Sequence, residues 1–503
     1  MLEAAASALQ HLFTPLPFLA LVVGTIFGLI SGAMPGGSLP FLVVLMGFAF
    51  HLDPYVAIPL AIGHMAVTAT TDAIPCILMG IPGSASAQAT ILDGYPMAKQ
   101  GRAGEALAAA YFASLLGGII GAIALAASLP VARALLRLFG SPEFFLMGLI
   151  GIAMVGVISS GALVKGLLTG ALGLAIAMVG FDPISGVPRA TFGIQYLWDG
   201  LPLIPVVVGL FAFPEFLDMV ISDSPIARER LDLLKDNVGR GRAAGIKAVL
   251  HHKFLVLRSS LIGVFIGILP GVSGNTAHWL AYAQAMQTEK GARETFGRGD
   301  IRGVIAPESA NNSVDGGDLI PTVTFAIPGS GGNAVFLGFL ILLGFQPGPR
   351  MLSEHLDVLL LMVWSLALAN IIATAVALYF TPLMAEISVV RPNVLVPIVV
   401  AMLTISAFQA TRSMGDLVVV AAFSVLGWFM KRFGWPRPPI IIALVLARPL
   451  EKYLWLSVNT YGWAMLARPQ FVVMLALAVL AVLYSLWAQA RAREKFARDA
   501  LGR

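Results

Sequence analysis

Residues 72–84 read Asp72-Ala-Ile-Pro75-Cys-Ile-Leu-Met-Gly-Ile81-Pro-Gly-Ser84, and residues 318–330 repeat the pattern as Asp318-Leu-Ile-Pro321-Thr-Val-Thr-Phe-Ala-Ile327-Pro-Gly-Ser330. A second matching pair precedes them, Gly28-xxx-Gly32-xx-Pro35-Gly36 and Gly263-xxx-Gly267-xx-Pro270-Gly271. Proline and glycine interrupt helices, and backbone groups freed inside a membrane need a partner. Duplicated, interrupted segments in corresponding halves of an apolar chain are typical of the binding site of a secondary transporter.

The composition is that of a membrane protein rather than of a soluble domain. Hydrophobic residues make up 58% of the 503 residues and charged residues only 12%, whereas a soluble domain is about 25% charged. Because a spanning helix takes about 20 residues, we expect an all-α polytopic membrane protein with roughly 10–12 transmembrane segments. The single cysteine, Cys76, excludes an intrachain disulfide and a cysteine metal site. The sequence has no Gly-xxxx-Gly-Lys-Ser/Thr loop, which argues against an ATP-driven pump in one chain.

The duplicated motifs and the distribution of charge divide the chain into four parts. These are a first transmembrane repeat half (1–218), a basic connector (219–253), a second transmembrane repeat half (254–450), and a C-terminal transmembrane helix with a basic tail (451–503). Lys and Arg concentrate in cytoplasmic loops, so we expect the connector and the C-terminus in the cytoplasm. We expect the halves to be inverted repeats, with residues 72–92 and 318–345 forming re-entrant hairpins or broken helices.

The interrupted segments offer groups that suit an anionic solute. A helix that restarts after a break presents unpaired N–H groups and the positive end of its dipole, which favour a carboxylate. Hydroxyl and amide side chains follow the breaks, and no arginine lies within the motifs. As an alternative, glycines spaced by four pack helices closely, and Pro-Gly-Ser forms a tight turn at the membrane surface. The predicted substrate-binding residues are Gly36, Gly37, Ser38, Ser84, Ser86, Ser273, Asn275, Thr276, Ser330 and Asn333.

Five polar residues near the apolar stretches are candidates for binding a coupling cation. A carboxylate at membrane depth is costly and marks an ion path, and asparagine oxygens coordinate hard cations. As alternatives, the aspartates and asparagines cap helices, and Glu308 pairs with an arginine in a loop. We expect no cofactor, no structural metal and no catalytic residue, because the serine motifs contain neither His nor Lys. The cation candidates are Asp72, Glu308, Asn311, Asn312 and Asp318.

Several longer blocks resemble the large membrane subunit of the tripartite tricarboxylate transporter family, known as TctA, and the resemblance covers nearly the whole chain. It implies a secondary importer in the bacterial inner membrane that works with a small four-span membrane subunit and a periplasmic solute-binding protein. It also implies organic anions as substrates, chiefly citrate and other di- or tricarboxylates, a Na⁺ or H⁺ gradient as the driving force, and, by analogy, an elevator-like motion. The blocks are Leu92–Gly104, Pro307–Ser313, Leu319–Pro321, Ile327–Ser330 and Gly344–Pro349.

One block departs from the family's usual pattern. Small apolar residues usually follow the asparagine pair, whereas this chain has Ser313-Val314-Asp315. An additional negative charge disfavours a trianion, which weighs against citrate itself. Two other classes of protein are considered: an anion channel also accommodates repeats and broken helices, and a membrane-embedded enzyme needs a nucleophile and a base that the motifs lack. The sequence does not distinguish Na⁺ from H⁺ as the coupling ion.

Overall fold

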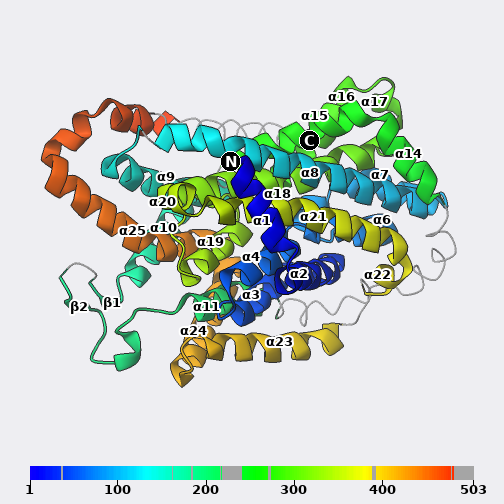
Figure 1. Cartoon of the computed structure of the whole chain (residues 1–503). Helices are drawn as coiled ribbons and strands as arrows, with labels where there is room; N and C mark the ends of the chain where they lie inside the picture. The colour runs from blue at the N-terminus through cyan, green and yellow to red at the C-terminus, as the bar shows by residue number, and fades with distance from the viewer. Residues whose placement is uncertain are drawn as a thin grey trace, which may run out of the picture.

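The computed structural model describes residues 1–34, 38–136, 138–160, 163–182, 185–215, 217, 241–269, 273–387, 392–476 and 479–480. Within these residues the regular elements are helices, apart from the short antiparallel strands β1 (Gly180–Phe181) and β2 (Pro188–Arg189) (Figure 1). The all-α prediction is therefore confirmed. The elements before the central connector are α1 (Leu2–Leu12), α2 (Pro15–Ala33), α3 (Ser38–Ala49), α4 (Pro54–Met65), α5 (Thr68–Thr71), α6 (Ala73–Met79), η1 (Ala85–Ala87), α7 (Thr90–Lys99), α8 (Ala103–Leu136), α9 (Ser141–Ser160), α10 (Leu163–Ala177), η2 (Gln195–Leu197), α11 (Leu203–Val207) and η3 (Val208–Ala212). The later elements are α14 (Arg242–His251), α15 (Lys253–Ile268), α16 (Ser273–Thr288), α17 (Ala292–Thr295), α18 (Arg302–Phe325), α19 (Gly331–Leu342), α20 (Pro349–Glu354), α21 (Leu356–Tyr379), α22 (Thr381–Ile387), α23 (Pro392–Gln409), α24 (Met414–Arg432), α25 (Pro438–Tyr461) and η4 (Gly462–Ala467).

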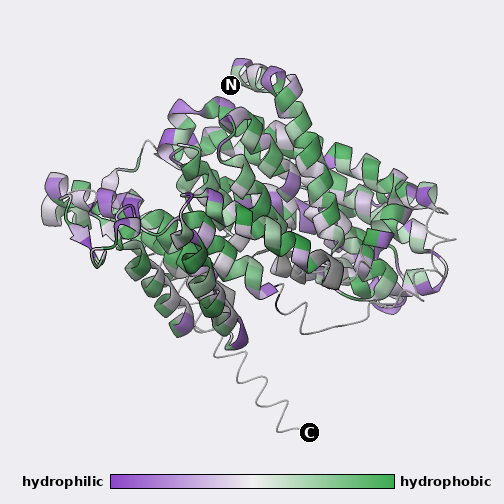
Figure 2. Cartoon of the chain, turned by 90° about the horizontal axis from the view of Figure 1, so that it is seen from below, coloured by the Kyte–Doolittle hydropathy of each residue, from purple (hydrophilic) through white to green (hydrophobic). Residues whose placement is uncertain are grey.

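Five helical segments of the described chain are long and apolar enough to cross a membrane, and the pair α14–α15, bent by 76°, would make a sixth. Hydrophobic residues cover most of the helices, while hydrophilic residues gather mainly in connecting segments (Figure 2). The chain is thus a multi-pass membrane protein. The total of roughly 10–12 spans stays a prediction, because further apolar helices in the described chain are shorter. The five segments are Pro15–Ala33, Pro54–Met79, Ala103–Leu135, Leu356–Tyr379 and Met414–Arg432.

Glycines spaced by four residues let α2 and α15 approach their neighbours backbone to backbone. A Cβ on Gly24 or Gly28 of α2 would collide with a carbonyl oxygen of α4. On α15, a Cβ on Gly263 or Gly267 would collide with a carbonyl oxygen of α18 in the same way. The interpretation of these glycines as packing residues is therefore correct. They pack α2 against α4, which precedes Asp72, and α15 against α18, which carries Asp318.

The two Pro-Gly breaks that follow these glycines lie outside the described residues, at 35–37 and 270–272. The flanking helices are described: α2 ends at Ala33 and α3 begins at Ser38, while α15 ends at Ile268 and α16 begins at Ser273. A helix therefore ends before each Pro-Gly pair and another begins after it.

Helix α18 is a buried polar helix inside an apolar protein. Helices α8, α15 and α16 pack along it (Figure 1), and a Cβ on Gly316 of α18 would collide with the backbone of Gly121 on α8. Its polar residues Glu308, Asn312 and Asp318 are all buried. Helix α18 is not among the apolar spanning segments. Because its polar groups are buried, the helices around it separate them from lipid.

Helices from the two predicted halves interlock. Helix α8 packs along α18, and α21 packs on α1, α4 and α8. The Tyr55 hydroxyl of α4 donates a hydrogen bond to Asp357 of α21, and Trp364 Nε1 of α21 donates to the Ala5 carbonyl at 3.0 Å. The four-part division of the chain stays a prediction. Residues 242–251 of the predicted connector form α14, which packs on α8. Helix α25 continues across the predicted boundary at residue 450. The predicted basic tail lies outside the described residues.

Candidate functional site

The first copy of the duplicated motif forms a helix end, a tight turn and a buried carboxylate. Helix α6 ends at Met79, and Gly80 follows in the left-handed conformation with φ 69° and ψ 24°. Asp72, only 3% exposed, accepts a hydrogen bond from Ser84 Oγ to Oδ2 at 2.6 Å. The hydroxyl of Ser84 also lies 3.0 Å from that of Ser86. We call residues 80–86 the first tip.

The second copy forms the same structure in a later part of the chain. Helix α18 ends at Phe325, and Ala326 takes the left-handed conformation with φ 57° and ψ 32°. Asp318, 2% exposed, accepts a hydrogen bond from Asn333 Nδ2 to Oδ2 at 2.9 Å. Ser330 Oγ accepts the backbone N–H of Asn333 at 3.2 Å and caps α19. We call residues 326–333 the second tip.

The backbones of the two tips agree closely. The Ile81 N–H donates to the Pro75 carbonyl at 3.3 Å, and the Ile327 N–H donates to the Pro321 carbonyl at 3.1 Å. Ser84 has φ −137° and ψ 167°, and Ser330 has φ −139° and ψ 168°. Each of these bonds follows a left-handed residue and joins residues six apart, one more than in the six-to-one bond of the common helix ending. In both segments a helix ends at the tip and another helix begins after it, and the choice between a re-entrant hairpin and a broken helix for 72–92 and 318–345 stays a prediction.

Helix α18 places the two aspartates of the duplicated motif along one of its faces. Asn311 Nδ2 donates to Asp72 Oδ2 at 3.4 Å, and Asp318 follows Asn311 by seven residues. Two helical turns bring a residue back to the same face, about 10 Å further along the axis. Asp315, between them, lies within electrostatic range of both Asp72 and Asp318.

Several buried oxygens at these tips have no hydrogen-bond partner among the described residues. They are Asp72 Oδ1, Glu308 Oε2, Asp315 Oδ2, Asp318 Oδ1 and Asn333 Oδ1. Buried polar atoms are nearly always satisfied in folded proteins, so a cluster of vacant acceptors calls for a ligand, an ion or a proton. The described residues include no group of three or more His, Cys, Asp or Glu side chains arranged to hold a metal ion.

The family model of the tripartite tricarboxylate transporter TctA family matches residues 18–442. The chain belongs to the TctA family. A protein of Agrobacterium vitis, described as an uncharacterized 52.8 kDa protein in the TAR-I ttuC' 3'region, is 27% identical over 452 residues, which cover 88% of this chain and 87% of that protein. A second Agrobacterium vitis protein, described as an uncharacterized protein in the TAR-II ttuC' 3'region, is 28% identical over 192 residues, 38% of this chain and 79% of that protein.

The structure of this TctA-family chain describes some of the predicted substrate residues and not others. Ser84, Ser86, Ser330 and Asn333 lie at the two tips. Ser38 is half-buried at the start of α3, and Thr276 is exposed on α16. Gly36 and Gly37, together with the side chains of Ser273 and Asn275, lie outside what the structure describes.

The predicted cation residues of the TctA-family chain fall into separate groups. Asp72, Asn311 and Glu308 gather at the first tip, and Asp318 lies at the second. Asn312 lies elsewhere: its Nδ2 donates to the Ser114 carbonyl at 2.9 Å and to Asn370 Oδ1. The capping alternative is wrong for both asparagines, because they lie inside α18.

The alternative that Glu308 pairs with an arginine in a loop stays a prediction, and no arginine side chain bonds to Glu308 among the described residues. Instead, Thr90 Oγ donates a hydrogen bond to Glu308 Oε1, and His278 lies beside Thr90. Sequence reasoning missed Thr90 and His278. Thr90 stands in the run of small hydroxylated residues after the first Pro-Gly, whereas His278 is a lone histidine on an otherwise apolar helix segment.

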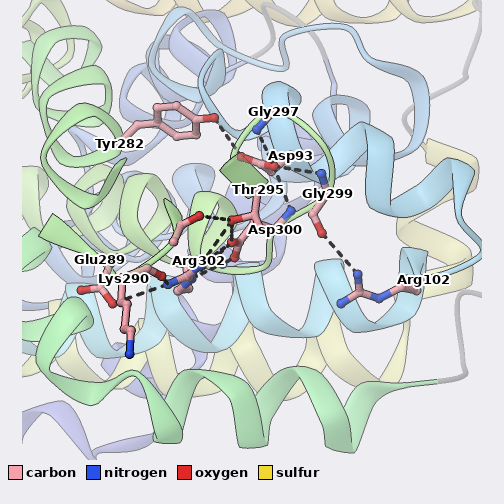
Figure 3. Close-up of polar contacts among 11 residues, drawn as sticks. Asp93, Arg102, Tyr282, Glu289, Lys290, Thr295, Gly297, Gly299, Asp300 and Arg302 are labelled. Atoms are coloured by element: carbon pink, nitrogen blue, oxygen red, sulfur yellow. Dashed lines mark hydrogen bonds and ion pairs between the residues drawn. The ribbon is translucent and has the colours of Figure 1, made fainter. Parts of the chain in front are cut away.

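Residues of the block Leu92–Gly104 bind the turn at residues 297–300, which leads into α18 (Figure 3). Asp93 Oδ1 accepts the backbone N–H groups of Gly297, Gly299 and Asp300 at 2.8, 3.0 and 2.9 Å. Its Oδ2 accepts the hydroxyl of Tyr282 at 2.8 Å. The buried Asp93 carboxylate thus serves as an internal anion bound by three backbone amides.

Charges outside the spans reinforce this turn. Arg102 Nη1 donates to the Gly299 carbonyl at 3.2 Å, and Arg302 pairs with Asp300 at 2.7 Å. Burial acts to raise the pKa of Asp300, but hydrogen bonds from Arg302 and Thr295 and the charge of Arg302 outweigh it and hold this pKa below its ordinary value. The turn is therefore ordered by ionised groups at neutral pH.

Proposed function

We propose that the chain is the large, translocating membrane subunit of a binding-protein-dependent secondary importer of organic anions. One observation carries the proposal: two tips of the same geometry each bond a buried aspartate, and the two aspartates lie along one face of the buried polar helix α18. A binding site between duplicated, broken segments is the arrangement expected of a secondary transporter.

Substrate binding follows from the groups beside the tips. Helix α19 begins at Gly331, directly after Ser330, so its first N–H groups and positive dipole end suit a carboxylate. Ser84, whose hydroxyl donates to Asp72, and Ser86, which lies beside it, are the proposed contacts from the first tip. Di- and tricarboxylates, such as citrate, are the proposed substrates, with Gly36, Gly37, Ser38, Ser273, Asn275 and Thr276 completing the proposed site.

Coupling to a cation follows from charge. Asp72 and Asp318 are buried beside the proposed anion site, and in the described part of the chain neither forms an ion pair with Lys or Arg. Buried carboxylates repel an incoming carboxylate, and a cation bound to them removes that repulsion. Cation and anion therefore raise each other's affinity, which is the thermodynamic basis of symport. Na⁺ or H⁺ is the proposed coupling ion, and the proposed motion is elevator-like.

Membership in the TctA family supports the proposed setting. The chain would lie in the bacterial inner membrane with its central connector and C-terminus in the cytoplasm. A small four-span membrane subunit would accompany it, and a periplasmic solute-binding protein would deliver the substrate. No enzymatic step and no cofactor enter this scheme.

The test is anion uptake into proteoliposomes that contain this chain, its small subunit and the loaded binding protein. Na⁺ and H⁺ gradients are imposed separately. Accumulation that requires the binding protein and one gradient is the expected result. Equilibration without a gradient would indicate a channel, and chemical conversion of the anion would indicate an enzyme.

A matched pair of variants tests the role of the second tip. We expect Asp318→Asn to lower the apparent affinity for the coupling cation about tenfold or more, since tenfold corresponds to only about 1.4 kcal/mol. Glu294→Gln, an exposed glutamate on α17, should leave the cation dependence unchanged. An unaltered cation dependence in Asp318→Asn would remove Asp318 from the site.

A further inference from the structure

Three buried side chains form a polar path from α16 through α7 to α18. His278, Thr90 and Glu308 are each 0% exposed. Thr90 Oγ donates a hydrogen bond to Glu308 Oε1 and lies 3.4 Å from His278 Nε2. The Ala89 backbone N–H donates to Nδ1 of the same histidine, also at 3.4 Å.

The Ala89 contact gives this path a direction. Because Nδ1 accepts an N–H, the hydrogen bonds assign the proton of a neutral His278 to Nε2. Nε2–H then donates to Thr90 Oγ, and the hydroxyl of Thr90 donates to Glu308. The path therefore ends on a carboxylate oxygen.

Glu308 lies beside Asp72 at the first tip. Asn311, which binds Asp72, follows Glu308 by three residues and shares its helix face. Each carboxylate has one bonded oxygen: Asp72 Oδ2 accepts Ser84 and Asn311, and Glu308 Oε1 accepts Thr90. The other oxygen of each, Asp72 Oδ1 and Glu308 Oε2, is buried without a partner among the described residues.

The described groups that face Glu308 do not include a Lys or Arg. They are Asp72 and Cys76 on the α5–α6 segment, Tyr111 on α8, and His278 on α16 through Thr90. Asp72 in turn faces a further carboxylate, Asp315 of α18. Two neighbouring carboxylates at this depth, without a counter-ion, cannot both remain ionised at an acceptable energy. One of the two negative charges has to be neutralised.

We propose that Asp72 and Glu308 share one exchangeable proton, held between Asp72 Oδ1 and Glu308 Oε2, and that Thr90, which His278 holds in place, sets the pH at which the pair releases it by donating a hydrogen bond to Glu308. The proposal rests on the proposed function and names the coupling ion of that same site. A proton needs only two oxygens, whereas hard metal cations take about six. The proton is taken up from one aqueous side and released to the other, and it forms no bond with the substrate.

The first experiment compares two glutamate variants in proteoliposomes that hold the complete transporter complex. Wild type should accumulate the anion under an imposed pH gradient without Na⁺. Glu308→Gln, which imitates the protonated state, should retain anion exchange in a counterflow assay but lose accumulation and lose its dependence on pH. Glu294→Gln should behave as wild type in all three measurements.

A second experiment tests the hydrogen bond from Thr90 to Glu308. A donor bonded to the ionised carboxylate favours ionisation, so its removal favours protonation. Thr90→Val should therefore shift the pH profile of counterflow to higher pH by about one unit, which corresponds to about 1.4 kcal/mol. Thr90→Ser keeps the hydroxyl and should keep the wild-type midpoint, which a merely structural role of Thr90 would not predict.

Distinct results separate the failure of this inference from that of the proposed function. Binding-protein-dependent accumulation driven only by Na⁺, with no response to pH, would overturn the proton proposal and leave the importer in place. So would pH-driven accumulation by Glu308→Gln. If neither gradient drives uptake, the proposed function fails and the inference fails with it. Should Glu308→Gln not fold, Asp72→Asn carries the same expectation, and the Thr90 pair remains.

Discussion

Asp72 and Asp318 occupy equivalent places in the duplicated motif, yet different side chains surround them. Each aspartate is bonded by the serine of its own tip, but Asp72 is also bonded by Asn311 from another helix and Asp318 by Asn333 of its own tip. The neighbouring carboxylate is Glu308 for Asp72 and Asp315 for Asp318. Two residues that match in sequence can therefore bind different partners, and a duplicated motif does not imply duplicated chemistry.

Asn312 illustrates the same point for adjacent residues, and it yields a stability prediction. Asn312→Ala removes hydrogen bonds to the Ser114 carbonyl and to Asn370, and leaves Asn370 Oδ1 buried without its donor. We expect a loss of about 1–3 kcal/mol in the free energy of unfolding. The apparent cation affinity of the folded protein should stay at the wild-type value. Thermal unfolding in detergent and cation titration of uptake measure the two quantities, and a lowered affinity with normal stability would contradict the assignment.

The residues of the site were predictable to the extent that the sequence repeats itself. Asp72, Ser84, Asp318 and Ser330 stand out because the motif occurs twice, and the structure gives both copies the same turn. Thr90 and His278 were not predictable, since their link to Glu308 joins positions far apart in the chain. Asn312 was assigned with Asn311, but a helix turns about 100° per residue, so neighbours in sequence face different helices.

At the scale of elements, proline and glycine patterns predicted where helices break but not where the central helix begins. The run from 302 to 317 is too polar to be read as a span, and its asparagines were also interpreted as helix caps. It forms the first part of α18 because α8, α15 and α16 enclose it and satisfy its polar groups. Local hydropathy carries no information about such enclosure, which depends on tertiary contacts.

The turn before α18 gives a prediction for an element. Asp93→Asn keeps an oxygen acceptor for the three backbone amides but removes its charge, which should cost about 1.5–3 kcal/mol in unfolding free energy. Tyr282→Phe removes one hydrogen bond and leaves the three amide bonds intact, so it should cost about 1 kcal/mol. Thermal unfolding together with hydrogen exchange at Gly297, Gly299 and Asp300 would measure both effects. Equal protection of these amides in Asp93→Asn and wild type would show that the carboxylate does not order the turn.

At the scale of the whole molecule, the two predicted halves depend on each other for burial. The glycine-lined crossing of α8 with α18 and the packing of α21 on α4 both join one half to the other. Without α8, one side of a helix that carries Glu308, Asn312 and Asp318 would face lipid, which is costly for such groups.

The interlocking predicts that neither half is stable alone. Residues 1–230 and 231–503, produced separately, should each be degraded or aggregate, whereas their co-expression should give a complex that purifies as one species. The measurement is co-purification through a tag on one fragment, followed by uptake assays. Two independently stable, monodisperse fragments would show that the interhelical contacts between the halves contribute little.

The vacant buried carboxylate oxygens also bear on the electrical behaviour of transport. Even with one proton shared between them, Asp72 and Glu308 together keep one negative charge, and no Lys or Arg side chain bonds to either among the described residues, so the site without its anion has a charge of its own. Moving one elementary charge across a potential of 100 mV changes the energy by about 2.3 kcal/mol. The return of the empty site across the membrane should therefore respond to voltage, and the bound proton and anion together would set the current that accompanies each cycle.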